Sequence, residues 1–260
     1  MQRLFLIVAG LVAIFLTLPL LIIIPMSFST VKTFQFPPPG YGLQFYRSYF
    51  SDPNWLVPTA NSFIIAFIVT ALTLVLVIPA SFAYVRRRFW GRQAINLLIM
   101  APLIVPAVVS ALGFYGAFSS FRLNGSLIGV SIAHTALAIP VSFLVMTAAL
   151  KGFDWNLERA SMISGATPLK TFFFVTMPVL APGIVTAALF AFLASFNEPV
   201  VALFIAGRNA STLPKKMFES IRLETDPVIA VVSSLLIVAL FLTAAAVLFA
   251  RNRARPLSRN

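Results

Sequence analysis

Long apolar stretches alternate with shorter polar ones along the whole chain. A helix needs about 20 consecutive apolar residues to cross a bilayer. Stretches of that kind lie at residues 4–26, 59–85, 94–118, 127–150, 183–206 and 228–250. The pattern predicts an all-α integral membrane protein with six transmembrane helices, which form a single transmembrane domain over residues 1–260.

The first apolar stretch follows Arg3, so a secretory signal peptide is an alternative interpretation of it. The apolar core of a signal peptide is shorter, about 7 to 15 residues, and leads to small residues at a cleavage site. Here the stretch continues to Pro25 and Met26 without such a site. It is therefore predicted to remain in the protein as a transmembrane helix.

Prolines interrupt most of the predicted spans. Each proline removes one backbone hydrogen bond from its helix, and lipid offers no partner for the freed carbonyl group. The resulting kinks are therefore expected to face neighbouring helices or a water-filled path. The prolines concerned are Pro19, Pro79, Pro102, Pro106, Pro140 and Pro199.

Lysine and arginine gather on one side of the predicted spans. Twelve of the 19 basic residues would lie on that side, namely Arg3, Arg86, Arg87, Arg88, Arg92, Lys151, Arg159, Lys170, Arg251, Arg253, Arg255 and Arg259. Basic residues are enriched in cytoplasmic loops. Both termini are therefore predicted to be cytoplasmic, which agrees with an even number of spans in a bacterial inner membrane.

The composition fits a protein surrounded by lipid. The chain is 60% hydrophobic and 10% charged, whereas soluble domains are about half apolar and a quarter charged. Its net charge of +12 does not indicate nucleic-acid binding, because most basic residues lie at the ends of apolar stretches. Cysteine is absent and His134 is the single histidine, so neither a metal site nor a cofactor is expected.

No arrangement of catalytic residues is recognisable in the sequence. It has no G-x-x-x-x-G-K-[ST] phosphate loop, so ATP hydrolysis by P-loop chemistry is not expected of this chain. Six of the seven carboxylates fall in predicted loops or at span ends, where solvation is the usual explanation for a charge. The chain is therefore predicted not to be an enzyme.

The predicted external loop at residues 27–58 is rich in aromatic side chains. Pro37, Pro38 and Pro39 break regular structure there, and aromatic residues follow at Phe45, Tyr46, Tyr49, Phe50 and Trp55. Aromatic side chains favour the headgroup level of a membrane, so part of the loop could lie along the outer surface as a short interfacial segment. A packed loop with no role in transport is the alternative.

Two polar residues fall inside predicted spans. Glu198 lies in the fifth apolar stretch, where a carboxylate is costly unless it faces a partner or water. Pro199 would loosen the helix beside it and free carbonyl groups to line a cavity, an arrangement that suits a cationic substrate. Pairing with another subunit or with headgroups is the alternative for Glu198. His134 in the fourth stretch is expected to hydrogen-bond to a neighbouring helix rather than to line a path.

The segment at residues 154–182 is predicted to be cytoplasmic and to hold two short helices. Residues 156–164 read as a helix that ends at Gly165, which can adopt the left-handed conformation at a helix C-terminus. A second helix is expected to begin here, because threonine is preferred at the N-cap, as at Thr167, and proline at the first helical position, as at Pro168. Small side chains at Ala160 and Ser161 would let another protein approach closely. The segment is interpreted as a docking element, with an ordinary amphipathic connector as the alternative.

This segment resembles the signature of the permease subunits of binding-protein-dependent ABC importers. That signature is Glu-Ala-Ala, three further residues and Gly, then, at a fixed distance, a hydrophobic residue followed one place on by Leu-Pro. In this chain the Glu-Ala-Ala positions are occupied by Arg159, Ala160 and Ser161, and the glycine is Gly165. The last part of the signature corresponds to residues 175–178, which end in Pro178. The leading acid is replaced by Arg159, and Glu158 lies one place earlier.

The resemblance implies a transmembrane permease domain with a cytoplasmic coupling helix. In the family this loop lies in a groove of the ATPase subunit, so Glu158, Arg159, Ala160, Ser161, Gly165 and Pro178 are the expected ATPase-coupling residues. The implied partners are ATP-binding cassette ATPase subunits, a second homologous permease subunit, a periplasmic solute-binding protein and membrane lipid. ATP hydrolysis is expected on the separate subunit.

Within this family, the sequence around residues 196–198 looks most like the spermidine and putrescine permeases. The resemblance implies a polyamine substrate, and Asn197 and Glu198 are the expected substrate-path residues. An importer of another small solute, such as an opine, an amino-acid-like compound or iron, is one alternative. A secondary transporter that works without ATP is another, although the two halves of the chain show no inverted repeat.

Overall fold

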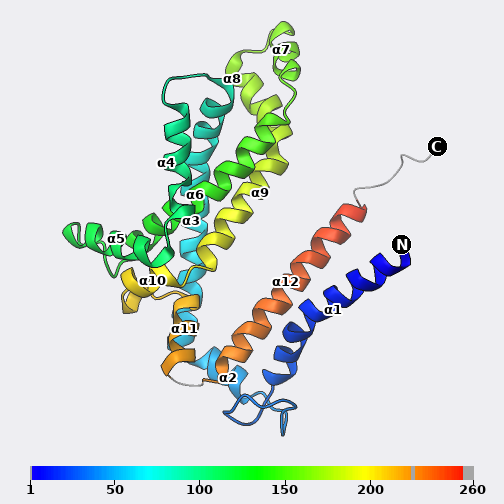
Figure 1. The fold of residues 1–260 in the computed structure, drawn as a ribbon, viewed down its shortest axis with the longest axis vertical. Coiled ribbons are helices and arrows are strands. Elements are labelled where there is room, and N and C mark those ends of the chain that lie inside the picture. Colours follow the sequence, from blue (N-terminus) through cyan, green and yellow to red (C-terminus); the bar gives the residue numbers. More distant parts are fainter. Residues whose placement is uncertain (1, 224–225, 254–260) are drawn as a thin grey trace. The chain divides into compact units, whose positions relative to one another are not determined.

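The computed structural model describes residues 2–223 and 226–253 of the chain. Backbone contacts divide the protein into two compact units. Unit 1 comprises Met1–Leu56 and Met217–Asn260, and unit 2 comprises Val57–Lys216. The described residues are almost entirely helical, which confirms the predicted all-α fold class (Figure 1). A single domain over residues 1–260 stays a prediction.

Unit 2 contains the longer series of helices. Its first helix, α3, begins in unit 1 and continues into unit 2. The elements are α3 (Pro53–Arg86), α4 (Arg92–Ile104), α5 (Ala107–Ser120), α6 (Leu127–Lys151), α7 (Asn156–Ile163), α8 (Pro168–Thr171), the π-helical turn η1 (Phe172–Thr176), α9 (Met177–Phe196), α10 (Val200–Ile205), the 3-10 turn η2 (Arg208–Ala210) and α11 (Leu213–Leu223), which ends in unit 1.

The helices α6 and α9 lie side by side and form the centre of unit 2 (Figure 1). Near one end, His134 Nδ1 lies 3.0 Å from Ser195 Oγ, which confirms the expected interhelical hydrogen bond of the histidine. Further along, Ser142 Oγ donates to Ala187 O at 3.2 Å. Small residues at such a contact let two helix backbones approach closely in a membrane.

Gly183 lies at a close contact between α9 and α6. A methyl group added at Gly183 would lie 2.5 Å from Ala149 Cβ, too close for two carbon atoms. Gly183→Ala is therefore expected to destabilise the protein by about 1–3 kcal/mol, because overpacking forces backbone shifts. Thermal unfolding in detergent measures the loss. Gly116→Ala in α5 is the control, since nothing lies within 4 Å of its added methyl group; equal stability of the two variants would contradict the predicted contact.

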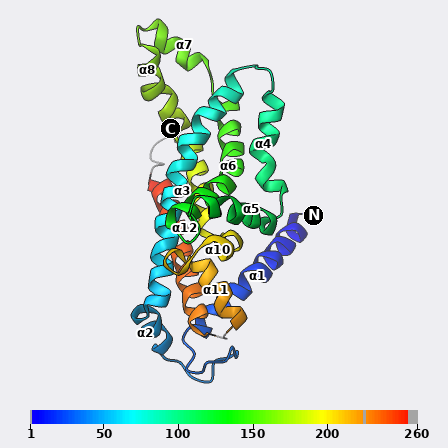
Figure 2. The same cartoon turned by 90° about the vertical axis from the view of Figure 1, so that its left-hand side faces the viewer.

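The third predicted span, 94–118, is wrong as one continuous helix. It consists of α4 and α5, which meet at an angle of 105°, while α4 lies beside α6 (Figure 2). The break falls at Val105 and Pro106, where Val105 is extended with ψ 129°. Proline disfavours the helical conformation of the residue before it, which accounts for the position of the bend.

The fifth predicted span, 183–206, is also wrong in its bounds. The helix begins earlier, since α8, η1 and α9 run without a break from Pro168 to Phe196, and it ends before Asn197. Helical structure resumes only at Val200 in α10. The two ends differ for separate reasons. Asn197, Glu198 and Pro199 interrupt the helix at its end, whereas at its start the π-helical turn η1 joins α8 to α9 without a break.

The remaining predicted spans agree with single helices. Among the residues that the structure describes, four helices are long and apolar enough to cross a membrane, and the bent α4–α5 pair would make a fifth. In unit 1, α12 (Val228–Arg253) coincides with the sixth predicted stretch, and within the part whose side chains the structure describes continuously, Val228–Thr243 is an apolar helix of less than the length of a span. The total of six therefore stays a prediction. Of the noted prolines, Pro19, Pro79, Pro102 and Pro140 lie within helices, and Pro106 and Pro199 lie at breaks.

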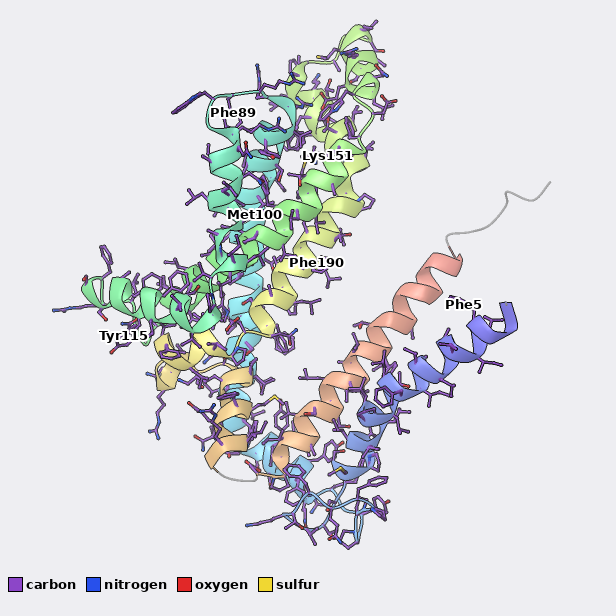
Figure 3. The ribbon with its side chains drawn as sticks, in the orientation of Figure 1. Phe5, Phe89, Met100, Tyr115, Lys151 and Phe190 are labelled. Atoms are coloured by element: carbon purple, nitrogen blue, oxygen red, sulfur yellow. The ribbon has the colours of Figure 1, made fainter. Side chains whose placement is uncertain are left out.

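Unit 1 pairs its first and last helices. The helix α1 (Gln2–Met26) lies beside α12, and α12 also contacts the short helix α2 (Gln44–Ser51). Most side chains of α1 are exposed, as Phe5 illustrates (Figure 3). In a membrane protein, such a surface suits contact with lipid or with another subunit.

The predicted external loop contains the helix α2, and its aromatic side chains are largely packed within unit 1. Phe45, Tyr49 and Trp55 are buried, and Trp55 Nε1 donates to Asp226 Oδ2 at 3.3 Å. Phe50 is exposed. The packing of the three buried rings favours the alternative of a packed loop over an interfacial segment.

Candidate functional site

The helix α7 has the bounds and the ending that its sequence predicts. It covers Asn156–Ile163, and Asp154 Oδ1 accepts a hydrogen bond from the Asn156 amide at 3.0 Å just before it. Gly165 follows with φ +88°, the left-handed conformation expected at this position. The predicted first helix of the segment is therefore confirmed.

The second helix start is confirmed as well. Thr167 Oγ1 accepts from the Lys170 amide at 3.3 Å, and Pro168 occupies the first helical position. Because α8 continues through η1 into α9, this cap begins a helix of 29 residues that extends to Phe196. The turn after α7 is therefore joined directly to the start of a helix that is long and apolar enough to cross a membrane.

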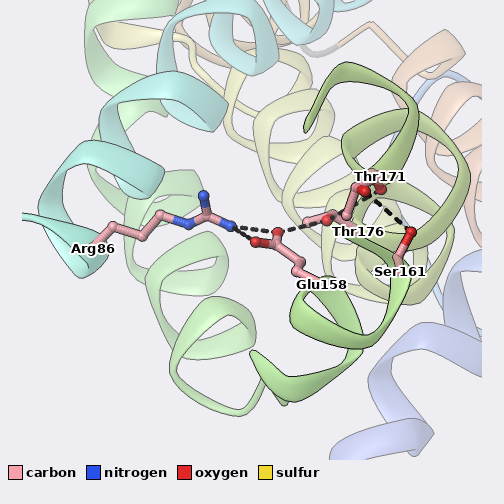
Figure 4. Close-up of polar contacts among 5 residues, drawn as sticks. All are labelled: Arg86, Glu158, Ser161, Thr171 and Thr176. Carbon is pink, nitrogen blue, oxygen red and sulfur yellow. Dashed lines mark hydrogen bonds and ion pairs between the residues drawn. The ribbon is translucent and has the colours of Figure 1, made fainter. Parts of the chain in front are cut away.

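Glu158 joins α7 to two other elements of unit 2. Both of its carboxylate oxygens accept from Arg86 Nη2 at the end of α3, and Oε1 also accepts from Thr176 Oγ1 at 2.6 Å (Figure 4). The Glu158 side chain is 13% exposed, and that of Arg86 is 39% exposed. The carboxylate thus connects α7 with the ends of α3 and η1 in a largely shielded position.

Aromatic and hydroxyl contacts reinforce this connection. The guanidinium of Arg86 lies 4.3 Å from the centre of the Trp155 ring, which holds the cation beside α7. Ser161 Oγ lies 3.0 Å from Thr171 Oγ1, so α7 also contacts α8 directly (Figure 4). We call Arg86, Glu158, Ser161, Thr171 and Thr176 the α7 anchor.

The other signature residues lie on the outside of unit 2. Arg159, Ala160 and Gly165 are exposed, as is Pro178 in the first turn of α9. Apolar side chains accompany them, since Leu157 is 41%, Met162 44% and Ile163 87% exposed. Glu158, one residue before the position where the signature has its acid, is directed into the anchor, whereas Arg159 is left on the exposed surface.

Asn197 and Glu198 lie at the opposite end of α9 from the anchor. The 20 residues of α9 span about 30 Å at 1.5 Å per residue, close to the thickness of the hydrocarbon core of a bilayer. Asn197 is exposed at the end of the helix, and Glu198 is half-buried. The prediction that Glu198 lies inside a continuous span is wrong, because it occupies the break between α9 and α10.

The Glu198 carboxylate caps the next helix. Its Oε1 accepts from the Val201 amide at 2.9 Å, which places a negative charge at the N-terminus of α10. At the other end of α10, Lys215 Nζ donates to Ala206 O, and the Gly125 amide donates to Ile205 O at 2.8 Å. Opposite charges at the two ends thus match the helix dipole and fix this six-residue element.

Four phenylalanines lie just before this break. Phe63 and Phe67 of α3 contact Phe192 and Phe196 of α9, with ring centres 5.1 Å apart for Phe63 and Phe196 and 5.3 Å for Phe67 and Phe192. Phe63 is 42% and Phe67 64% exposed, so two rings of this aromatic cluster remain accessible. Sequence analysis missed the cluster, although a four-residue spacing on both helices was available as a signal.

Comparisons with known proteins agree with this arrangement. A family model described as binding-protein-dependent transport system inner membrane component matches residues 76–255, which include α7 and Glu198. The putrescine transport system permease protein PotI of Escherichia coli (strain K12) is 29% identical over 86% of this chain and 82% of its own length. The trehalose transport system permease protein SugB of Mycobacterium tuberculosis is 30% identical over 75% of this chain and 72% of its own length.

A solved structure shows a similar fold. It is described as a bacterial ABC transporter involved in the import of the acidic polysaccharide alginate, and the similar chain gives a TM-score of 0.76 at 16% identity. The similarity covers 95% of this chain and 94% of the other. The chain belongs to the family of inner-membrane components of binding-protein-dependent transport systems, and it is a permease subunit of an ABC importer.

Proposed function

We propose that this permease imports an aliphatic polyamine, such as putrescine or spermidine, and that Asn197 and Glu198 face its path. The observation that carries the proposal is a carboxylate at a helix break, two residues after a partly exposed aromatic cluster. An ammonium group is attracted to carboxylates and to the faces of aromatic rings, and the methylene chain between two ammonium groups can lie against the same rings.

The relatives named above differ in their substrates at similar identity, since one is named for putrescine and the other for trehalose. The substrate class therefore has to be argued from the residues. Aromatic rings suit a sugar as well as an amine, but a neutral sugar gains little from a carboxylate whose negative charge attracts cations. Glu198 therefore favours a polycation over a neutral sugar.

We further propose that the exposed face of α7 docks on an ATP-binding cassette ATPase and that both termini are cytoplasmic. The family implies an ATPase, a binding protein and a partner permease in general. In this chain, the exposed apolar residues of α7 supply a contact surface, and the anchor connects them to α3 and α9. Closure of the ATPase would then move α9, whose far end carries Glu198, while ATP hydrolysis itself takes place on the partner.

Glu198→Gln tests the proposed substrate path. The amide oxygen can still accept from the Val201 amide, so α10 keeps its cap while the negative charge is lost. We expect the rate of putrescine uptake by the reconstituted complex to fall about tenfold or more. This is the effect expected from the loss of one hydrogen bond to a charged group. Radiolabelled putrescine and trehalose are compared in proteoliposomes that contain the ATPase and the binding protein.

Asp154→Asn at the start of α7 is the matched control. It removes the same charge, and its side-chain oxygen can still accept from the Asn156 amide. Unchanged putrescine uptake by Glu198→Gln would refute a role for the carboxylate on the path. Uptake of trehalose but not putrescine by the wild-type complex would refute the substrate class and leave the importer assignment intact.

A further inference from the structure

An open groove of about 490 Å³ lies along the end of α3 that leads to Arg86. Its wall is apolar except at one end, where two arginines line it. The apolar residues are Ile78, Pro79, Phe82, Ala83 and Phe172, and the arginines are Arg86 and Arg87. Phe82 and Phe172 pack edge to face with ring centres 5.6 Å apart, so the groove joins α3 to the π-helical turn η1.

The charge at the end of the groove is positive and only partly compensated. Arg86 contacts Glu158 through Nη2, and a guanidinium carries further N–H donors on its other nitrogens. Arg87 is exposed, and its side chain has no ion-pair or hydrogen-bond partner among the residues that the structure describes. Glu158 thus compensates the charge of Arg86, and Arg87 leaves a net positive charge where the apolar wall ends.

The residues that follow place this end of α3 at the surface of the membrane. Arg88 and Phe89 continue the chain, and Trp90 is 99% exposed. Tryptophan and arginine are enriched where hydrocarbon meets the headgroups. With Arg87 and Trp90 at headgroup depth, Ile78 and Phe82 would lie at hydrocarbon depth, and a groove lined in this order suits one lipid molecule.

We propose that the groove binds an anionic phospholipid, with an acyl chain along the apolar wall and the phosphate at Arg87. Charge complementarity selects this occupant, because arginine recognises phosphate oxygens by charge-assisted hydrogen bonds, and basic pockets at the ends of membrane helices bind anionic headgroups. A zwitterionic lipid brings a compensating cation to the same place and is bound less well.

The position of the site links lipid binding to the coupling segment. Phe172 belongs to η1, and Arg86 is the ion-pair partner of Glu158 in the α7 anchor. A bound phosphate shares Arg86 with Glu158, so the lipid contacts the same cation that holds α7. Anionic lipid therefore stabilises the groove together with the anchor.

Native mass spectrometry of the assembled transporter tests this inference. The complex is delipidated in detergent and then incubated with equal amounts of phosphatidylglycerol and phosphatidylcholine. We expect retained phosphatidylglycerol to exceed phosphatidylcholine several-fold, and Arg87→Gln to reduce that preference to near equality. Arg87→Lys keeps the charge and is expected to retain most of the preference.

Arg88→Gln is the matched control, because Arg88 is the next residue but does not line the groove. An equal loss of preference in both Gln variants would show a diffuse charge effect and overturn the site. Equal retention of the two lipids by the wild-type complex would overturn the headgroup preference. Retention by the isolated chain but not by the complex would show that another subunit covers the groove, which also overturns the proposal.

Discussion

Replacement of Glu158 by alanine is expected to reduce ATP-driven uptake at least tenfold while the chain still reaches the membrane. The substitution removes the acceptor for Arg86 and for Thr176 Oγ1 in one step. Hydrogen bonds to a charged group contribute about 1.5–3 kcal/mol each, so α7 loses most of its polar connection to α3 and η1. Movement of the ATPase would then displace α7 without displacing α9.

Uptake and ATPase activity are measured together in proteoliposomes. We expect ATP hydrolysis to continue while putrescine uptake falls, because the movement of the ATPase is no longer coupled to α9. Ser164→Ala is the control on the same segment, because Ser164 Oγ bonds only within the α7 region, to Ala160 O at 3.0 Å. If Glu158→Ala transported as well as Ser164→Ala, the anchor would have no role in coupling. The charge exchange Arg86→Glu with Glu158→Arg is expected to recover part of the activity.

Gly207→Ala is expected to destabilise the protein by about 1–3 kcal/mol and to reduce transport several-fold. Its added methyl group would lie 2.9 Å from Gly125 Cα and 3.3 Å from Gly125 O, and backbone atoms cannot move aside as a flexible side chain can. Gly207 has φ −72°, which any residue adopts, so the contact alone causes the loss. The segment after α10 would have to shift, and with it the helix that Glu198 caps.

Gly165→Ala provides the contrasting case for this prediction. Gly165 has φ +88° and nothing within 4 Å of its added methyl group, so only backbone strain, about 1–2 kcal/mol, opposes the change. Thermal unfolding and putrescine uptake are measured for both variants. We expect Gly207→Ala to bind substrate poorly, as seen in a higher KM, whereas Gly165→Ala keeps the wild-type KM. Wild-type stability of Gly207→Ala would contradict the close contact between the two glycines.

Local signals in the sequence were sufficient to predict the two short helices at residues 154–182. The bounds of α7, the left-handed Gly165 and the cap at Thr167 each depend on a few neighbouring residues, and all three agree with the structure. The cap preferences of threonine and proline and the conformational freedom of glycine act over one turn. They can therefore be recognised without knowledge of the rest of the fold.

Interactions between distant residues were not predictable in the same way. Arg86 and Glu158 are separated by 72 positions, and neither side chain alone indicates its partner. Prolines show a similar limit, since Pro102 lies within α4 while Pro106, four residues later, lies at a bend of 105°. Whether a proline kinks or ends a helix depends on whether neighbouring groups can donate hydrogen bonds to the freed carbonyl groups.

Glu198 illustrates how hydrophobicity alone misplaced a site residue. The apolar stretch continues on both sides of it, so one span across residues 183–206 was the simplest prediction. The structure divides that stretch into α9 and α10, and the carboxylate that interrupts the pattern caps the second helix. The role of Glu198 on the substrate path stays a prediction. It is supported by the position of Glu198 at the helix break and by the aromatic cluster just before that break.

Photo-crosslinking from α7 tests most directly the central claim that α7 carries the ATPase contact. The natural chain has no cysteine, so Ile163→Cys, at a position that is 87% exposed, introduces a single site for a benzophenone maleimide. After illumination of membranes that contain the whole transporter, we expect a crosslink to the ATPase subunit, and none from Phe121→Cys, at an exposed position just after α5. A crosslink from Phe121→Cys but not from Ile163→Cys would place the ATPase at the other end of unit 2 and show that α7 does not contact it.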